Sequence, residues 1–274
     1  MLMIIQEIHS FEEYEDFICE LARHPLYSDP HFTHNRNNLY YSLERKDEFA
    51  FAVLDNRTIE GLFVWLIIPE EQYIEMIIGF TRNEEAFSEM LSYMEKKYPG
   101  FKLDFVFNPL NTAISRPLKA KGALFNPEQQ KMLHMGTLPD VSTECVELYS
   151  ERWKDHYCRL HRTETYWTAE RVISALYRFS VLLAVKEGKV QGYLDVTHCY
   201  DENEIYDLFV KPESAQQGYE MAMLAKAIEL NGQHKMMVLV DVDNEAETEL
   251  YAAAGFKRME GYNSVLASYR TEKE

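Results

Sequence analysis

Long apolar runs are missing from this sequence. A membrane-spanning helix needs roughly 18 or more consecutive apolar residues, and no segment reaches that length. Residues 1–8 are apolar, but they have neither a basic start nor a small-residue cleavage site, so we expect a strand there and not a signal peptide. The sequence therefore predicts no membrane partner.

Cysteine is scarce and dispersed. The four residues are Cys19, Cys145, Cys158 and Cys199, and no two of them form a CxxC pair. This spacing argues against a disulfide framework and a cysteine metal site, and it favours small buried side chains in a reducing cytoplasm. His156 and His161 are five positions apart, so they do not share one helix face as a histidine metal pair would. We therefore expect a cytoplasmic protein without a bound metal.

A basic stripe is also missing. The chain has 28 Lys and Arg against 45 Asp and Glu, and its formal net charge is −17. Proteins that bind DNA or RNA usually carry clustered positive charge, so nucleic acid is excluded as a partner. A negative field attracts cationic substrates such as amines, although it can also serve solubility alone.

What the sequence does contain is one pattern twice. The repeated positions are Gly61, Asn111 and Gly122 in the first half, and Gly192, Asn244 and Gly255 in the second. The asparagine and the following glycine are 11 positions apart in both halves (122 − 111 and 255 − 244). Equal spacing with little residue identity predicts two copies of one fold, because helix and loop lengths follow geometry more closely than side chains do.

Two domains of about 130 residues also suit a chain of 274 residues. Residues 136–143 are small, turn-forming and contain a proline, which is typical of a linker. We therefore expect a first domain at residues 1–138 and a second at residues 143–274.

Each half has the same predicted order of elements: a β-hairpin, a strand, a helix, a strand, a helix and a strand. In the first half these are residues 49–54 with 59–67, 72–80, 84–98, 101–107 and a helical stretch from Thr112 that is broken at Pro117 and ended by Gly122. In the second half they are residues 180–186 with 190–199, 204–210, 217–230, 236–242, 244–254 and 256–269. This order predicts an α+β fold, a mixed sheet flanked by helices, present twice.

Four segments of the second half resemble the GNAT superfamily of N-acetyltransferases. They are Ile205-Tyr-Asp-Leu-Phe-Val-Lys-Pro212, Gln216-Gln-Gly-Tyr219, Asn244-Glu-Ala-Glu-Thr-Glu-Leu-Tyr251 and Gly255-Phe256. The resemblance covers residues 144–269. It implies two tandem GNAT-like domains with mostly antiparallel sheets, and transfer of an acetyl group from acetyl-CoA to a primary amine of a small molecule by the second domain.

The resemblance also implies a binding site for acetyl-CoA. The backbone of Phe209 and Val210 would bond to the pantetheine amides. The pyrophosphate would lie on the N–H groups of the loop Gln216, Gln217, Gly218 and Tyr219, which open a helix and so attract anions. Asn244 would either bond to the pantetheine or cap its own helix.

Tyr251 and Asp207 are the expected catalytic residues. Tyr251 lies where many members of the superfamily have the acid that protonates the leaving thiolate, and its ordinary pKa near 10 suits that role; the alternative is a packed helix residue. Asp207 and Asp195 have the parity to face inward, and Glu204 and His198 lie on the same two strands, so the identity of the base stays open.

Departures from the superfamily pattern keep a second function open. Glu220 stands where the loop usually has Gly or Ala, and a carboxylate repels phosphate. The alternative is a catalytically silent double-GNAT module that binds CoA or another ligand.

The first half has less of the pattern. Residues 81–88 contain no glycine, and Leu118 replaces Tyr251. We expect a degenerate copy there, in a monomer with internal pseudo-symmetry or a homodimer.

Overall fold

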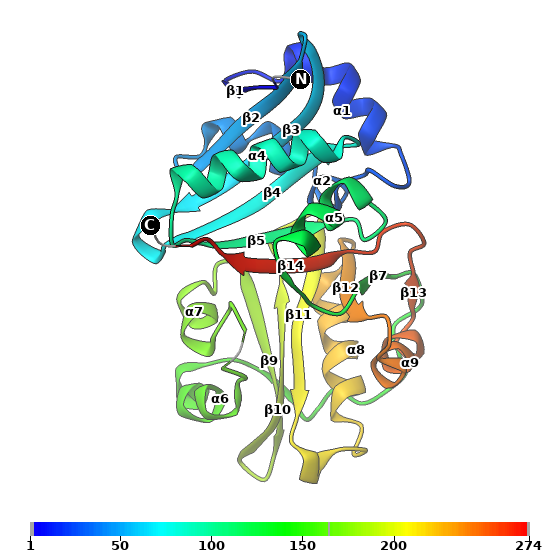
Figure 1. Ribbon diagram of the computed structural model, residues 1–274. Helices are drawn as coiled ribbons and strands as arrows, with labels where there is room; N and C mark the ends of the chain where they lie inside the picture. Colours follow the sequence, from blue (N-terminus) through cyan, green and yellow to red (C-terminus); the bar gives the residue numbers. More distant parts are fainter. Residues whose placement is uncertain (1–2, 164, 273–274) are drawn as a thin grey trace. The chain divides into compact units, whose positions relative to one another are not determined.

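The chain forms two compact units, which are described separately here (Figure 1). The structure, a computed structural model, describes residues 3–163 and 165–272. Unit 1 comprises Met1–Gln129 with Glu260–Glu274, and unit 2 comprises Gln130–Met259. Within the described residues, no helix is both long and apolar enough to cross a membrane.

Unit 1 is built on a seven-stranded sheet in the order β1-β2-β3-β4-β5-β14-β6. Its strands are β1 (Ile4–Ile8), β2 (Glu48–Asp55), β3 (Thr58–Ile68), β4 (Tyr73–Thr81), β5 (Lys102–Phe107), β14 (Val265–Arg270) and β6 (Leu124–Phe125). Its helices are α1 (Glu15–Ala22), α2 (Pro30–His34), α3 (Asn37–Tyr40), α4 (Glu84–Lys97) and α5 (Thr112–Ala120). Only β4 and β5 among these paired strands run parallel, so the sheet is mixed and mostly antiparallel.

Unit 2 repeats this plan in the order β13-β7-β12-β11-β10-β9-β8. Its strands are β13 (Phe256–Arg258), β7 (Gln129–His134), β12 (Lys235–Asp241), β11 (Glu202–Val210), β10 (Lys189–Thr197), β9 (Phe179–Lys186) and β8 (Val146–Leu148). Its helices are α6 (Lys154–Leu160), α7 (Ala169–Ser174), α8 (Tyr219–Asn231) and α9 (Glu245–Ala253). The expected architecture, two α+β copies with mixed sheets flanked by helices, is confirmed.

Helices cover both faces of each sheet, which explains the long apolar strands. In unit 2, α8 buries Met223, Leu224 and Ala227 against one face. The opposite face packs against α6 and α7 through aromatic side chains that include Tyr157 and Tyr193. A strand covered on both faces has no position that must be polar.

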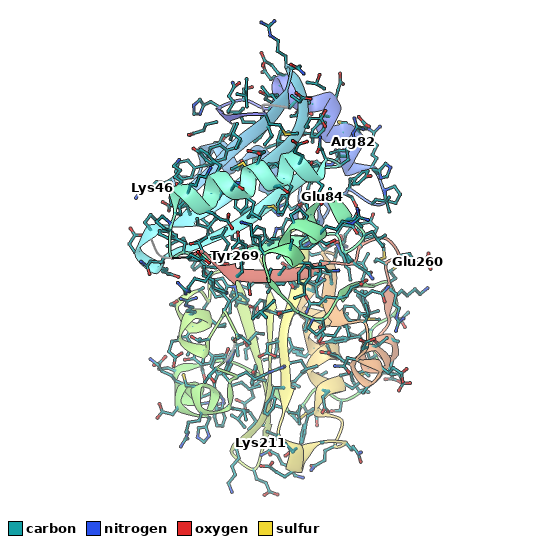
Figure 2. All side chains as sticks on the ribbon, in the orientation of Figure 1. Lys46, Arg82, Glu84, Lys211, Glu260 and Tyr269 are labelled. Atoms are coloured by element: carbon teal, nitrogen blue, oxygen red, sulfur yellow. The ribbon has the colours of Figure 1, made fainter. Side chains whose placement is uncertain are left out.

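The two halves of the sequence exchange strands. β14 comes from the end of the chain, but it lies in the sheet of unit 1 between β5 and β6, where Val265 pairs with Phe107 (Figure 1). Tyr269 of β14 stacks on Phe105 with ring centroids 5.8 Å apart and donates to Glu95 Oε1 at 2.9 Å (Figure 2). In return, β7 lies between β12 and β13 of unit 2.

This exchange corrects two expectations. The units are not the continuous ranges 1–138 and 143–274, because β7 and β14 each pair with strands from the other half of the sequence. The predicted last strand 256–269 is also two strands, β13 and β14, which belong to different sheets. A pattern of apolar residues records that a strand is buried, but not which sheet buries it.

Pro117 does not break its helix, contrary to our expectation. α5 continues to Ala120, and the N–H of Lys121 still donates to the carbonyl of Pro117 at 3.0 Å. Proline removes one backbone donor, but the following residues keep theirs, so a short helix can continue past it. Gly122 follows with φ of 72°, and its counterpart Gly255 has φ of 94°, as expected at equivalent helix ends.

Candidate functional site

In each sheet, the two parallel strands stop pairing at a corresponding position. In unit 2 the parallel pairing of β11 with β12 covers only Glu202–Ile205, so the rest of β11 has no partner strand on that edge. In unit 1 the pairing of β4 with β5 ends at Met76. An open strand edge presents backbone N–H and C=O groups to a ligand, so both units have the geometry of a strand-edge binding site.

A β-bulge marks the point where the strands part. In unit 2 the register with β10 shifts after Asp195, so Asp207 pairs with Asp195 and Tyr206 has no direct partner. The extra residue brings Tyr206 and Asp207 to the same face, because the alternation of side chains is interrupted there. Unit 1 has a corresponding shift in β4, where Ile77 is the unpaired residue.

The direction of the amides on β11 decides which residues could bind a ligand. The N–H of Lys211 donates to Gln191 on the β10 side at 2.9 Å, and backbone groups alternate in direction along a strand. Phe209 therefore turns its N–H and C=O toward β10, while Leu208 and Val210 turn theirs toward the open edge. The expected backbone role suits Val210 and not Phe209, and it adds Leu208.

Asp207 is buried, as its parity suggested, but both of its oxygens are occupied. Tyr193 Oη donates to Asp207 Oδ2 at 2.6 Å, and Arg162 Nη2 forms an ion pair with Oδ1. The same guanidinium donates to the carbonyl of Leu208 at 3.1 Å. A carboxylate held in this way is poorly placed to take a proton from an amine.

Tyr251 lies in the same neighbourhood. Its side chain is buried in the core of unit 2 with 1% of its surface exposed. Burial raises the pKa of the Tyr251 hydroxyl, the nearby charges of Glu247 and Asp207 raise it further, and Arg162 opposes the effect. The hydroxyl therefore stays protonated near neutral pH, as a proton donor must, and it lies close to Asp207 and Arg162.

The loop before α8 is exposed and has two left-handed residues. Gln216 has φ of 62° and Gly218, the N-cap, has φ of 80°. A Cβ built on Gly218 would have no heavy atom within 4 Å, and no side chain caps the helix. Gln217 accepts from Lys186 Nζ at 3.3 Å, while Tyr219 is buried in the core. The first N–H groups of α8 thus lie at an open, uncapped helix end, which favours anions.

Asn244 serves as the N-cap of α9. Its Oδ1 accepts from the N–H of Glu247 at 3.1 Å and its Nδ2 donates to Glu247 Oε2 at 2.8 Å. This reciprocal pair is a form of the capping box. Of the two roles considered for Asn244, the structure shows the cap.

In unit 1, side chains of the same unit occupy the corresponding strand edge. Asp29 Oδ2 accepts from the N–H of Gly79 at 2.9 Å, and His31 Nδ1 lies 2.8 Å from the carbonyl oxygen of Ile77. Asn111 Nδ2 donates to the carbonyl of Thr81 at 3.1 Å. Asp29 is the N-cap of α2 and His31 lies within this helix, which packs against both β4 and β5.

The helix that follows this edge in unit 1 is also capped. Asn83 Oδ1 accepts from the N–H groups of Glu85 at 2.9 Å and Ala86 at 3.3 Å. These are the groups that an anion would need. In unit 1, side chains of the same unit therefore form hydrogen bonds with backbone groups of both the strand edge and the helix start, which unit 2 leaves open.

The sequence did not reveal the role of Arg162 or of the buried network beside it. Asp195 Oδ2 accepts from Tyr157 Oη at 2.8 Å and lies 2.9 Å from His161 Nε2. His161 Nδ1 lies 2.7 Å from the carbonyl oxygen of Arg162, and the N–H of Arg162 donates to Tyr193 Oη at 3.2 Å. These bonds hold the backbone from which the Arg162 side chain reaches β11.

The titration of this network follows from its burial. Burial alone would lower the pKa of His161, but the bonds to Asp195 and to the Arg162 carbonyl raise it overall. Burial raises the pKa of Asp195, and the bonds from His161 and Tyr157 oppose this. Because a carbonyl only accepts, His161 Nδ1 carries a proton. No local motif signals such a network, since its members are brought together by the sheet.

A metal role finds no support. In residues 3–163 and 165–272, no group of three or more His, Cys, Asp or Glu side chains could hold a metal ion. The four cysteines are free thiols.

The comparisons with known proteins agree with this geometry. Residues 143–256 match the sequence model of the acetyltransferase (GNAT) family. Among curated proteins, none matches the sequence significantly.

Several solved structures have a similar fold over most or all of this chain. A tandem GNAT protein from the clavulanic acid biosynthesis pathway, in a structure without AcCoA, is 10% identical with a TM-score of 0.57, and the match covers 100% of both chains. A GCN5-related N-acetyltransferase from Sphaerobacter thermophilus is 13% identical with a TM-score of 0.61 over 81% of each chain. An acetyltransferase of the GNAT family from Colwellia psychrerythraea is 9% identical with a TM-score of 0.56, covering 98% of this chain and 100% of that one. Identity this low carries the fold alone. The family match places residues 143–256 in the acetyltransferase (GNAT) family, and the fold of the whole chain is similar to that of a tandem GNAT protein.

Proposed function

We propose that unit 2 transfers an acetyl group from acetyl-CoA to a primary amine of a small molecule. The observation that carries this proposal is the contrast between the two units. Unit 2 keeps an open strand edge and an uncapped helix start, whereas side chains fill both places in unit 1. Unit 1 is proposed to have no acetyl-CoA site of its own.

The residues of unit 2 suit the donor. The amides of Leu208 and Val210 would bond to the pantetheine arm, as an added strand would. The N–H groups from Gly218 to Glu220 would hold the pyrophosphate, because the helix dipole and the free donors favour negative charge there. The exposed loop residues Gln216 and Gln217 border this place.

The chemistry needs one proton donor near the sulfur. Acetyl-CoA supplies the thioester, which the neutral amine attacks at its carbonyl carbon; the C–N bond forms and the C–S bond breaks. Tyr251 is proposed to give its proton to the departing thiolate, because burial keeps its hydroxyl protonated and the proton is therefore available. Arg162 donates to the backbone carbonyl of Leu208, so it would place positive charge at the open strand edge, where negative charge develops during the reaction.

Asp207 has a revised role in this proposal. It holds the Arg162 guanidinium in place and does not receive the proton of the amine, because both of its oxygens already accept hydrogen bonds. The amine would then lose its proton to solvent. The negative net charge of the chain favours a cationic acceptor on approach.

A silent binding module is the second candidate, and Glu220 favours it. This residue lies in the first turn of α8, where its carboxylate would weaken phosphate binding. Turnover with any amine separates the two candidates.

The test of the donor site is acetyl-CoA binding measured by thermal shift and titration on the full chain. At 100 times its dissociation constant, a ligand that binds only the folded state adds about 2.7 kcal/mol of stability. Gly218→Glu should abolish this effect, because it adds bulk and negative charge where the phosphates would lie. Gly122→Glu is the matched control: Gly122 has φ of 72° and open space around it, but it lies in unit 1. Equal binding by both variants would remove the site from this loop.

A further inference from the structure

A groove on the α6 side of unit 2 lies apart from the open strand edge. It has a volume of about 280 Å³ and is lined by His156, Arg159, Leu160, Lys189, Val190 and Lys211. His156, Arg159 and Leu160 have the i, i+3, i+4 spacing that places side chains on one face of α6. None of the residues proposed to bind acetyl-CoA lines this groove.

The remaining lining residues come from one corner of the sheet. Lys189 and Val190 begin β10, and Lys211 directly follows β11, as its label in Figure 2 shows. The N–H of Lys211 donates to Gln191 at 2.9 Å, which holds the two strand ends together. Three separate elements thus direct basic side chains at one groove.

The charge of this groove is opposite to that of the chain. Acidic residues outnumber basic ones by 45 to 28, yet among the described residues no carboxylate lines the groove. Among the ion pairs of the described residues, none includes Arg159, Lys189 or Lys211. Arg159 donates through Nε to the carbonyl of Asp155 at 2.9 Å, and within residues 3–163 and 165–272 no hydrogen bond from its terminal nitrogens is present.

Several cations around one hollow repel one another unless an anion joins them. Guanidinium and ammonium groups bind phosphate through charge-assisted hydrogen bonds, Arg by its planar fork and Lys as a point charge. Leu160 and Val190 add apolar surface for a neighbouring hydrocarbon or ring. We propose that this groove binds a phosphate monoester.

Inorganic phosphate is the probe for this site. The full chain, labelled with nitrogen-15, is titrated with sodium phosphate at ionic strength matched by sodium chloride, and the amide signals of Leu160 and Val190 are followed by NMR. Wild type should show saturable shifts at both amides. The double variant R159Q/K189Q should raise the dissociation constant at least about fivefold, since two charge-assisted contacts are lost.

The matched control is K257Q/R258Q, which removes the same two charge types from exposed positions on β13. It should bind phosphate like wild type. Absence of saturable shifts in wild type, or equal affinities in the two double variants, would overturn the proposal.

The phosphate could belong to CoA itself or to a separate phosphorylated ligand, and a second arm distinguishes them. Affinities for CoA and for dephospho-CoA, which lacks the 3′-phosphate, are compared between wild type and R159Q/K189Q. If the groove takes the phosphate of CoA, the variant should bind CoA about fivefold more weakly and dephospho-CoA unchanged. If it takes a separate ligand, both affinities should stay the same while the phosphate titration still fails. A chain that binds phosphate in the groove but no CoA would contradict the proposed function and leave this site standing.

Discussion

Asn83 and Gly218 precede α4 and α8 at equivalent places in the two units, yet they leave the helices in different states. The side chain of Asn83 accepts from two N–H groups of its helix, whereas Gly218 has no side chain to cap α8 and accepts only through its carbonyl, from Ala222. The strand edges differ in the same way. In unit 1 Asp29 accepts from the N–H of Gly79, whereas at the equivalent Leu208 the carbonyl accepts from Arg162.

This difference shows how side chains can occupy the strand edge and the helix start of one unit while the fold stays the same. Unit 1 needed no new element, since side chains of its own α2 segment and helix caps took over the backbone groups that a ligand would use. Buried backbone groups must find a partner in either case. In unit 2 the proposed ligand would supply that partner.

The largest effect is expected from separating the halves at the apparent linker. A fragment of residues 143–274 lacks β7 and carries β14 without its sheet, so it should not unfold cooperatively. A fragment of residues 129–259 contains all seven strands of its sheet and should melt cooperatively by circular dichroism. Cooperative melting of the first fragment at the same temperature as the second would show that β7 is dispensable.

The next effect concerns Tyr251, the proposed acid of unit 2, whose place in unit 1 is taken by Leu118. Tyr251→Phe should lower kcat by about 10²–10⁴, the usual contribution of a general acid, while acetyl-CoA binding persists. The measurement is turnover with any amine found by screening, after the melting temperatures have been matched. Equal kcat in both proteins would make Tyr251 a packing residue.

A smaller effect is expected when the filled edge of unit 1 is opened. Asp29→Ala leaves the buried N–H groups of Gly79 and Phe32 without an acceptor, which should cost roughly 2 kcal/mol in the free energy of unfolding. Urea unfolding measures it. Asp29→Asn keeps one acceptor oxygen and should lose less, and Asp155→Ala on the surface should lose almost nothing. If Asp29→Ala were as stable as wild type, the filling of this edge would be incidental.

The smallest effect is the pH dependence of the network in unit 2. The pKa of His161 is raised in the folded state, so its contribution to stability is fully present below the ordinary histidine pKa of about 6.5 and is lost as the pH rises through the raised value. The raised pKa of Asp195 acts in the same direction, at a lower starting pH.

The check is the free energy of unfolding from pH 6 to 9 for wild type and His161→Asn. Their difference should shrink with rising pH, by at most about 1.4 kcal/mol per pH unit. His234→Asn, an exposed histidine of the same unit, serves as control. A constant difference would mean that His161 does not titrate in this range.

Much of the fold was predictable because local chemistry specifies it. The spacing of Asn111 with Gly122, and of Asn244 with Gly255, corresponds to helices of equal length with equal caps at both ends. The open loop at Gly218 follows from a residue that tolerates positive φ.

The rest was not local. The sequence favours Phe209 for a backbone role in binding. The bulge and the register decide the direction of each amide, and neither can be read from the sequence. Arg162 follows a helix in a stretch with no motif, and only the sheet brings it to Asp207 and Leu208. The destination of residues 265–270 was equally hidden, since an apolar strand fits either sheet.

The exchange of strands also determines when each sheet can be completed during synthesis. β14 leaves the ribosome 158 residues after β5 (265 − 107), the strand to which it pairs. At about 5–20 residues per second this is a delay of roughly 10–30 s. During that time β5 presents an unpaired edge, which is a site for wrong pairing with other chains. The first half of this protein is therefore the last to be completed, and its dependence on chaperones should exceed that of unit 2.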